Sequence, residues 1–138
     1  MNRISGPLLD RIDMHIEVTP VDFREMGSNR PEEGSATVRE RVMKAREVQR
    51  RRFSVCPGVH TNYMMNSKMI KEYAPLDSDC ITLLERAMSR LSLSARAYDR
   101  IIKLARTIAD MEANNDITPS HIAEAINYRS LDRENWGN

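Results

Sequence analysis

Residues 93–101 read LSARAYDRI, and this stretch decides the fold because it opens a strongly periodic helix. Ser94 is the expected N-cap, since a serine side chain accepts a hydrogen bond from a free backbone N–H in the first turn. The apolar residues that follow recur every three or four positions, as on the buried face of a helix. The pattern predicts a helix over about 95–114, whose buried face carries Tyr98, Ile101, Ile102, Ala105, Ile108, Ala109 and Met111 or Glu112.

Further helices are predicted on both sides of this one. Periodicity and turn residues place them at about 37–53, 67–73 and 78–91, and a last helix begins at Pro119, where a missing N–H costs nothing. The expected N-caps are Ser35 or Thr37, Asp77 and Thr118. Residues 37–130 are therefore expected to form a small helical bundle, with a tail over 131–138. The buried face of the 37–53 helix is expected to carry Val38, Val42, Ala45, Val48 or Gln49, and Phe53.

The N-terminal part has a different pattern. Residues 13–19 alternate apolar and polar side chains, which is typical of a half-buried strand, and Pro20 ends that strand. A single strand is not stable alone, so its sheet is expected in sequence outside this chain. We expect residues 1–23 to be the end of a larger α/β core, residues 24–36 to be a linker, and residues 1–34 to be poorly ordered here. The predicted fold class is mainly α with one residual strand.

Arg11 lies in the segment ISGPLLDRID at 4–13, between a Gly-Pro turn and the predicted strand. That position is the mouth of a sheet, where ligands gather in α/β folds. A guanidinium grips phosphate oxygens well because its planar fork donates two parallel hydrogen bonds. The alternative is a salt bridge with the flanking Asp10 or Asp13.

Arg96 is the second candidate for phosphate binding. It occupies the second position of the 95–114 helix, where free N–H groups and the helix dipole favour an anion. Ser94 adds a hydroxyl at the same end. A cation in a first turn does not help the helix itself, which invites a functional explanation. The alternative is a surface arginine paired with Asp99 or Asp77.

The polar face of the 37–53 helix is dense in cations, and Arg46, Arg50, Arg51 and Arg52 are its candidate nucleic-acid contacts. Such a face can follow a phosphate backbone. The alternative is a solvated helix with a Glu40–Lys44 pair and further pairing through Glu47.

Composition excludes several classes of function. The net charge of the 138 residues is +1, so no global field argues for nucleic acid or a membrane. Aromatic residues make up 5%, too few for a base-stacking platform. Cys56 and Cys80 read as reduced thiols of a cytoplasmic protein, no metal-ligand spacing is present, and no segment is long and apolar enough for a membrane helix. No phosphate-binding loop is present, and the chain starts directly in a motif, which indicates a piece of a longer protein.

Two motifs in this order, ISGPLLDRID and LSLSARAYDRI followed by ARTIAD, resemble the C-terminal part of the magnesium-chelatase-like AAA+ ATPases, in the ComM/YifB competence-protein branch. The similarity covers about residues 3–130. The first motif is also similar to an element of the replicative minichromosome-maintenance helicases, with Ile12 in place of an aromatic residue.

The resemblance implies roles for both arginines. Arg11 matches the arginine finger offered across a subunit interface to the neighbour's ATP. Arg96, with Ser94 beside it, matches the sensor-2 arginine of the helical lid, which contacts the γ-phosphate of its own subunit's ATP. The P-loop and the acidic motif that holds Mg²⁺ lie upstream in the family. This chain alone is therefore expected to bind no ATP stably and to hydrolyse none, whereas the full-length protein is expected to be an ATPase.

The same resemblance implies partners. They are the upstream AAA+ core, neighbouring subunits of a homo-oligomeric ring, expected to be a hexamer, and DNA that is remodelled by branch migration or recombination. Two alternatives from other classes stay open. One is a non-enzymatic helical module that binds DNA through the 37–53 helix. The other is a dimerisation module, because residues 107–129 also resemble histone-fold helices.

Overall fold

A computed structural model describes residues 6–16 and 33–134, with side chains described up to residue 129 apart from a few at the N-terminus. Within these ranges the chain is helical and contains no strand, which confirms a mainly α fold. Asn62–Met64 is a single 3₁₀ turn in the connection between the predicted helices 37–53 and 67–73. The elements are α1 (Gly6–Arg11), α3 (Ser35–Arg52), η1 (Asn62–Met64), α4 (Ser67–Tyr73), α5 (Ser78–Leu91), α6 (Ala95–Met111) and α7 (Pro119–Glu134).

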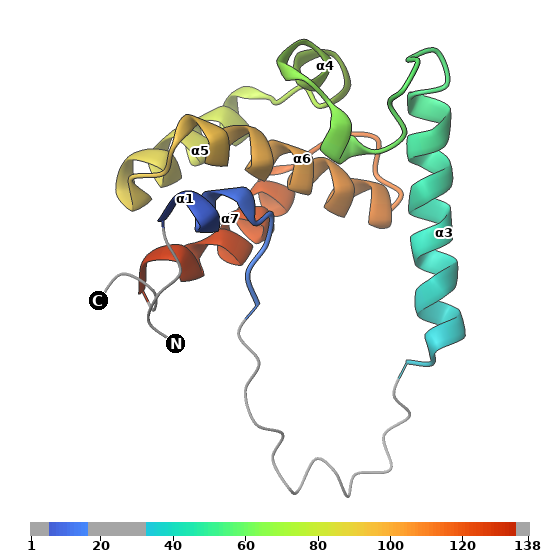
Figure 1. Ribbon diagram of the computed structural model, residues 1–138, viewed down its shortest axis with the longest axis horizontal. Helices are drawn as coiled ribbons and strands as arrows, with labels where there is room; N and C mark the ends of the chain where they lie inside the picture. The colour runs from blue at the N-terminus through green and yellow to red at the C-terminus, as the bar shows by residue number, and fades with distance from the viewer. Residues whose placement is uncertain (1–5, 17–32, 135–138) are drawn as a thin grey trace, which may run out of the picture.

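Helix α6 is the centre of the bundle (Figure 1). It packs against α7, α3, η1 and α4, while α5 packs against α7. The predicted buried face of α6 is confirmed at Ile101, Ile102, Ala105 and Ala109, and Tyr98 and Ile108 are half-buried at its edges. From other elements, the buried core adds Phe53, Met65, Ile70, Ala74, Cys80, Leu84, Ile117, Ile122 and Ala125.

Capping side chains fix several helix starts as predicted. The Asp77 carboxylate accepts from the Cys80 N–H at 2.8 Å, and the Ser94 hydroxyl accepts from the Ala97 N–H at 3.2 Å. The predicted bounds of α4 and α5 are confirmed. The expected cap of α3 is wrong, because Gly34 occupies the N-cap position and no side chain bonds there.

Helix α6 ends at Met111, earlier than the predicted residue 114. Ala113 adopts a left-handed conformation with φ of 56°, and the Asn114 N–H turns back to the Ala109 carbonyl at 2.8 Å. The buried Arg106 guanidinium then donates to the carbonyls of Asn114 and Asn115 at 2.7 and 2.9 Å. These bonds satisfy the free carbonyls past the helix end and fix the loop that leads to α7.

Only the second half of α3 joins the bundle. Its buried residues are Ala45 and Gln49, with Phe53 buried just beyond the end. At the position predicted as Val48 or Gln49, the buried residue is Gln49. Val38 is exposed, so its predicted place on a buried face is wrong. Figure 1 shows the reason: the N-terminal half of the helix stands away from the other described helices, so nothing described there covers it.

The N-terminal segment differs from the prediction. Gly6 and Pro7 begin a helix instead of forming a turn, because a first helical turn tolerates proline. Residues 12–16 are neither helix nor strand, and residues 6–16 and 33–34 have a defined structure where poor order was expected. The rest of the predicted strand and residues 24–32 of the linker lie outside the described residues. Helix α7 reaches Glu134, so the first four residues of the expected tail are helical.

A buried polar network joins α3, η1 and α6. The Asp110 carboxylate, fully buried, accepts both terminal nitrogens of Arg52 at 2.6 and 2.7 Å. It also accepts from Asn62 at 2.8 Å and from Arg106 at 3.2 Å. Gln49 accepts from the Asn62 N–H at 2.9 Å. Four donors therefore saturate one buried carboxylate, the condition under which such a charge is tolerated in a protein interior.

Replacing Asp110 by Ala is expected to destabilise the chain by about 3–5 kcal/mol, because two arginines lose the carboxylate that compensates them. The matched control is Glu47→Ala, which removes the partner of the exposed Arg50 and Arg51. That control is expected to leave the urea midpoint nearly unchanged, since exposed ion pairs contribute little. Urea denaturation followed by circular dichroism measures both, and equal shifts would contradict a structural role for the network.

Candidate functional site

The turn between α5 and α6 sets the position of Arg96. Ser92 ends α5 in a left-handed conformation with φ of 47°, and the Leu93 N–H returns to the Met88 carbonyl at 3.1 Å. Ser94 then caps α6, so Arg96 falls in the first turn as the sequence predicts. The Ser94 hydroxyl accepts the capping bond, which leaves its own proton available to a ligand.

Arg96 is exposed and forms no ion pair with any residue in the ranges that the structure describes. Neither alternative partner, Asp99 or Asp77, forms an ion pair with it. The Asp77 carboxylate instead caps α5, and the hydrogen bond that it accepts from the Cys80 backbone N–H is the main reason that its pKa is lowered. A guanidinium therefore lies beside the positive end of a capped helix with nothing described to neutralise it. Such a place suits an anion.

Arg11 lies in the last turn of α1 and is also exposed. Within the described residues it makes no ion pair, so the alternative pairing with Asp13 is not observed. Asp13 instead pairs with Arg100 on α6. The side chain of Asp10 lies outside the described part of the chain. Both candidate phosphate arginines are thus available to a ligand or a partner.

The segment after α1 docks on the bundle through polar contacts. The Ile12 carbonyl accepts from the buried Arg129 guanidinium at 2.5 Å, and the His15 N–H donates to the Tyr128 carbonyl at 2.7 Å. Figure 1 shows this part of the chain beside α6 and α7. Because Asp13 pairs with Arg100 one turn after Arg96, the tertiary structure links the two sequence motifs.

The apolar side chains of the same segment face away from the bundle. Ile12, Met14 and Ile16 alternate with the docked residues, and all three are exposed, Ile16 by 65%. Of the predicted 13–19 alternation, Met14 and Ile16 lie within the described residues, and no strand forms there. The apolar face of the segment is left partly open.

The four cations proposed for nucleic acid do not share one environment. Arg46 is exposed, while Arg50 and Arg51 pair with Glu47 at 2.7 and 3.1 Å. Arg52 turns inward to Asp110 and is only 13% exposed, so its place on a solvent-facing basic surface is corrected. The expected Glu40–Lys44 pair is present at 2.9 Å. The expected ion-paired helix surface is thus present, and it leaves Arg39 and Arg46 without a described partner.

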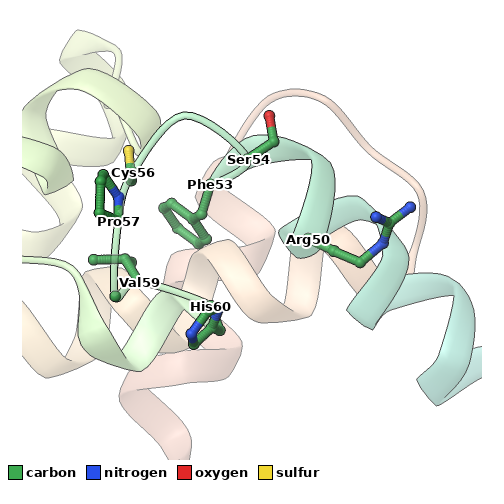
Figure 2. Close-up of a pocket in the computed structure, with 8 residues that line it drawn as sticks. Arg50, Phe53, Ser54, Cys56, Pro57, Val59 and His60 are labelled. Atoms are coloured by element: carbon green, nitrogen blue, oxygen red, sulfur yellow. The ribbon is translucent and has the colours of Figure 1, made fainter.

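Hollows in the bundle lie elsewhere. One of about 370 Å³ lies between the end of α3 and the next loop, with Phe53 facing Pro57 and Val59 (Figure 2). Two others, of about 340 and 450 Å³, are lined mainly by α4 and α6, and by α5 and α7. Arg11 and Arg96 line none of the three. In the part of the chain that the structure describes, no group of three His, Cys, Asp or Glu side chains is arranged to hold a metal ion.

The hollow of Figure 2 has a mainly apolar floor. The Phe53 ring packs edge-on against Tyr73 with 5.4 Å between ring centroids, and the Tyr73 hydroxyl contacts the Cys56 sulfur at 3.4 Å. The hydrogen bond with Cys56 is the main cause that raises the pKa of Tyr73 to about 12. These contacts describe packing of the loop onto α4, so the hollow is not assigned a ligand.

Comparison with known proteins identifies the family of the chain. A family model described as "Magnesium chelatase, subunit ChlI C-terminal" matches residues 32–129, which include α3, η1, α4, α5 and α6 and most of α7. The chain belongs to this family. Two of its members by similarity are Competence protein ComM of Haemophilus influenzae, 42% identical over 135 residues, and the uncharacterized protein YifB of Escherichia coli, 41% identical over 135 residues. A more distant relative is the uncharacterized protein Rv2897c of Mycobacterium tuberculosis, 28% identical over 131 residues.

These comparisons cover nearly all of the chain but only part of the relatives. The alignments span 96%, 96% and 94% of this chain, and 25%, 26% and 25% of the respective relatives. The chain therefore spans about a quarter of the length of the relatives that it matches, and it corresponds to the C-terminal part of ComM and YifB. None of the helices in its described ranges is both long and apolar enough to cross a membrane.

Two contacts that matter to this site were missed by sequence reasoning, which named Asp13 only as an alternative partner of Arg11. Arg100 and Asp13 stand 87 positions apart, and Arg129 reaches the Ile12 carbonyl across 117 positions. The spacing of apolar residues along the sequence does not predict contacts between residues so far apart. The one usable signal was that Arg100 and Asp13 both belong to the two motifs that carry the family resemblance.

Proposed function

We propose that this chain is the sensor-2 lid of a cytoplasmic, ring-forming AAA+ ATPase that couples ATP binding and hydrolysis to DNA remodelling. The observation that carries the proposal is Arg96, exposed and unpaired among the described residues, at the Ser94-capped start of α6. ATP with Mg²⁺ would be bound in the full-length protein, mainly by an upstream core. The ring, expected to be a hexamer, would be built from copies of that protein.

The chemistry at Arg96 would be electrostatic. In phosphoryl transfer, negative charge spreads over the transferred group, and positioned cations stabilise it. Arg96 would contact the γ-phosphate of its own subunit, and the Ser94 hydroxyl would donate to the same group. Hydrolysis removes that contact, so the position of the lid would depend on the nucleotide.

The need for an upstream core is supported by the open face of the N-terminal segment. Ile12 and Met14 are each 37% exposed and Ile16 is 65% exposed, so the described residues cover this apolar row only in part. Edge residues of this kind are stable when paired in a sheet. The relatives are about four times as long as this chain, which leaves ample sequence for such a sheet.

In the full-length protein, Arg96→Ala is expected to lower ATP turnover at least tenfold without loss of fold, because removing one charge-stabilising group costs of that order or more. Ser94→Asp is an independent test. It keeps a strong N-cap but places a carboxylate where the phosphate would bind, so turnover should also fall. Arg86→Ala, at an exposed arginine of α5, is the matched control. Unchanged turnover in Arg96→Ala would reject the sensor role, as would a natural gene that encodes no P-loop upstream.

Arg11 would act across the subunit interface as an arginine finger. An Arg11→Ala subunit with an intact P-loop, mixed with wild-type subunits, is expected to lower the activity of the mixture below the weighted sum of the two, because each variant subunit disables its neighbour's site. The measurement is ATP turnover against mixing ratio after subunit exchange. Strictly additive activities would exclude a finger that acts in trans.

A DNA contact along α3 is supported by the projecting half of that helix and by Arg39 and Arg46, which lack a described partner (Figure 1). The contact would be made to phosphates and not to bases, because no aromatic side chain is interleaved with the cations. The same surface carries the rival account, in which the helical module binds DNA without any ATPase activity.

Arg39→Gln with Arg46→Gln is expected to weaken DNA binding uniformly across sequences and to lower the salt slope of log K by about 2, roughly one per lost phosphate contact. Fluorescence anisotropy with duplex and single-stranded DNA at several salt concentrations measures this. The paired control is Arg86→Gln with Arg90→Gln, the same charge change on α5. An equal loss in both variants would show a general charge effect and reject the α3 surface.

A further inference from the structure

We propose that the Asp13–Arg100 ion pair is a positioning link that couples Arg11 to Arg96, so that consecutive nucleotide sites in the ring respond to one another. The inference rests on the proposed function, because it assigns a mechanical connection between the two arginines of that mechanism. It adds two residues, neither of which would touch the nucleotide.

Each residue of the ion pair lies close in sequence to one of the two arginines. Arg100 lies four residues after Arg96, so both side chains project from the same face of α6, one turn apart. Asp13 lies two residues after Arg11, directly beyond the end of α1. The Arg100 side chain is only 15% exposed, which limits the number of positions that its guanidinium can take. A movement of the first turns of α6 is therefore passed to the residue next to the finger.

The described backbone contacts of the segment run to α7 instead. Arg129 and the Tyr128 carbonyl, both on α7, hold the backbone of Ile12 and His15. Among the described contacts, Asp13 is the side chain that joins the segment to α6. Replacing it by Asn leaves the backbone bonds to α7 in place. The segment should then stay docked while its connection to the Arg96 helix is weakened.

The two arginines would serve different ATP molecules. Arg96 would sense the γ-phosphate of its own subunit, and Arg11 would stabilise charge on the neighbour's ATP. A rigid connection between them makes the neighbour's rate depend on the occupancy of the first site. Such a dependence is a coupling free energy between sites, and it is measured as cooperativity.

The test uses the full-length ring and the dependence of turnover on ATP concentration. Asp13→Asn and Arg100→Gln are each expected to lower the Hill coefficient from above 1 to about 1 while the saturated rate changes less than about fivefold, within the usual range of coupling effects. The reversed pair, Asp13→Arg with Arg100→Asp, is expected to regain cooperativity. Arg90→Gln, an exposed arginine of α5 outside the link, is the matched control.

The outcomes separate this inference from the proposed function. Cooperativity unchanged in Asp13→Asn, or a wild-type ring with a Hill coefficient of 1, overturns the link, and the ATPase proposal stands if Arg96→Ala still loses turnover. Unchanged turnover in Arg96→Ala overturns the proposed function itself. If a single variant does not assemble, the reversed pair decides: an assembled reversed pair without cooperativity overturns the link.

Discussion

The fold depends on a single buried carboxylate. Asp110 accepts hydrogen bonds from Arg52, Asn62 and Arg106, and thereby ties the end of α3, the 3₁₀ turn and the last turns of α6 to one point. A carboxylate without such donors is costly in a protein interior, so these elements gain stability only when they assemble together. The same cluster fixes the loop to α7, because Arg106 also holds the Asn114 and Asn115 carbonyls. The central helix is thus immobilised at its C-terminal end.

The N-terminal end of α6 differs from its C-terminal end, because it carries a cation without a described partner. Arg96 lies 14 residues before Asp110, about 21 Å along the helix at 1.5 Å per residue, and nothing described neutralises it. Because the stabilising charges are gathered at the C-terminal end, the N-terminal end can present a capped turn and an unpaired cation without cost to the core. This division of one helix into a fixed end and an open end would suit the lid role that we propose. It fits the membership of the chain in the magnesium chelatase C-terminal family.

The sequence-based predictions succeeded where local rules decide the structure. Helices α4 and α5 begin and end at the predicted residues, because Asp77 and the residues before Pro75 act within one turn of the chain. The predictions failed where a partner was needed. The predicted strand is absent from residues 13–16, where no described segment pairs with them, and the first half of α3 is exposed because no described element reaches it. Helix α6 ends early because Ala113 adopts a left-handed conformation that no propensity for alanine predicts.

Three consecutive arginines separate what the sequence determines from what the tertiary structure determines. By itself, the sequence determined that Arg50, Arg51 and Arg52 lie on a basic helix, that Arg96 lies in a capped first turn, and which family motifs the chain carries. Only the tertiary structure decided that Arg52 is buried against Asp110, 58 positions away, while its two neighbours stay at the surface. The physical reason is that successive helical residues differ by about 100° in direction, so one of the three faces α6. Pairs such as Asp13 with Arg100 likewise depend on how the helices pack, which periodicity and capping do not encode.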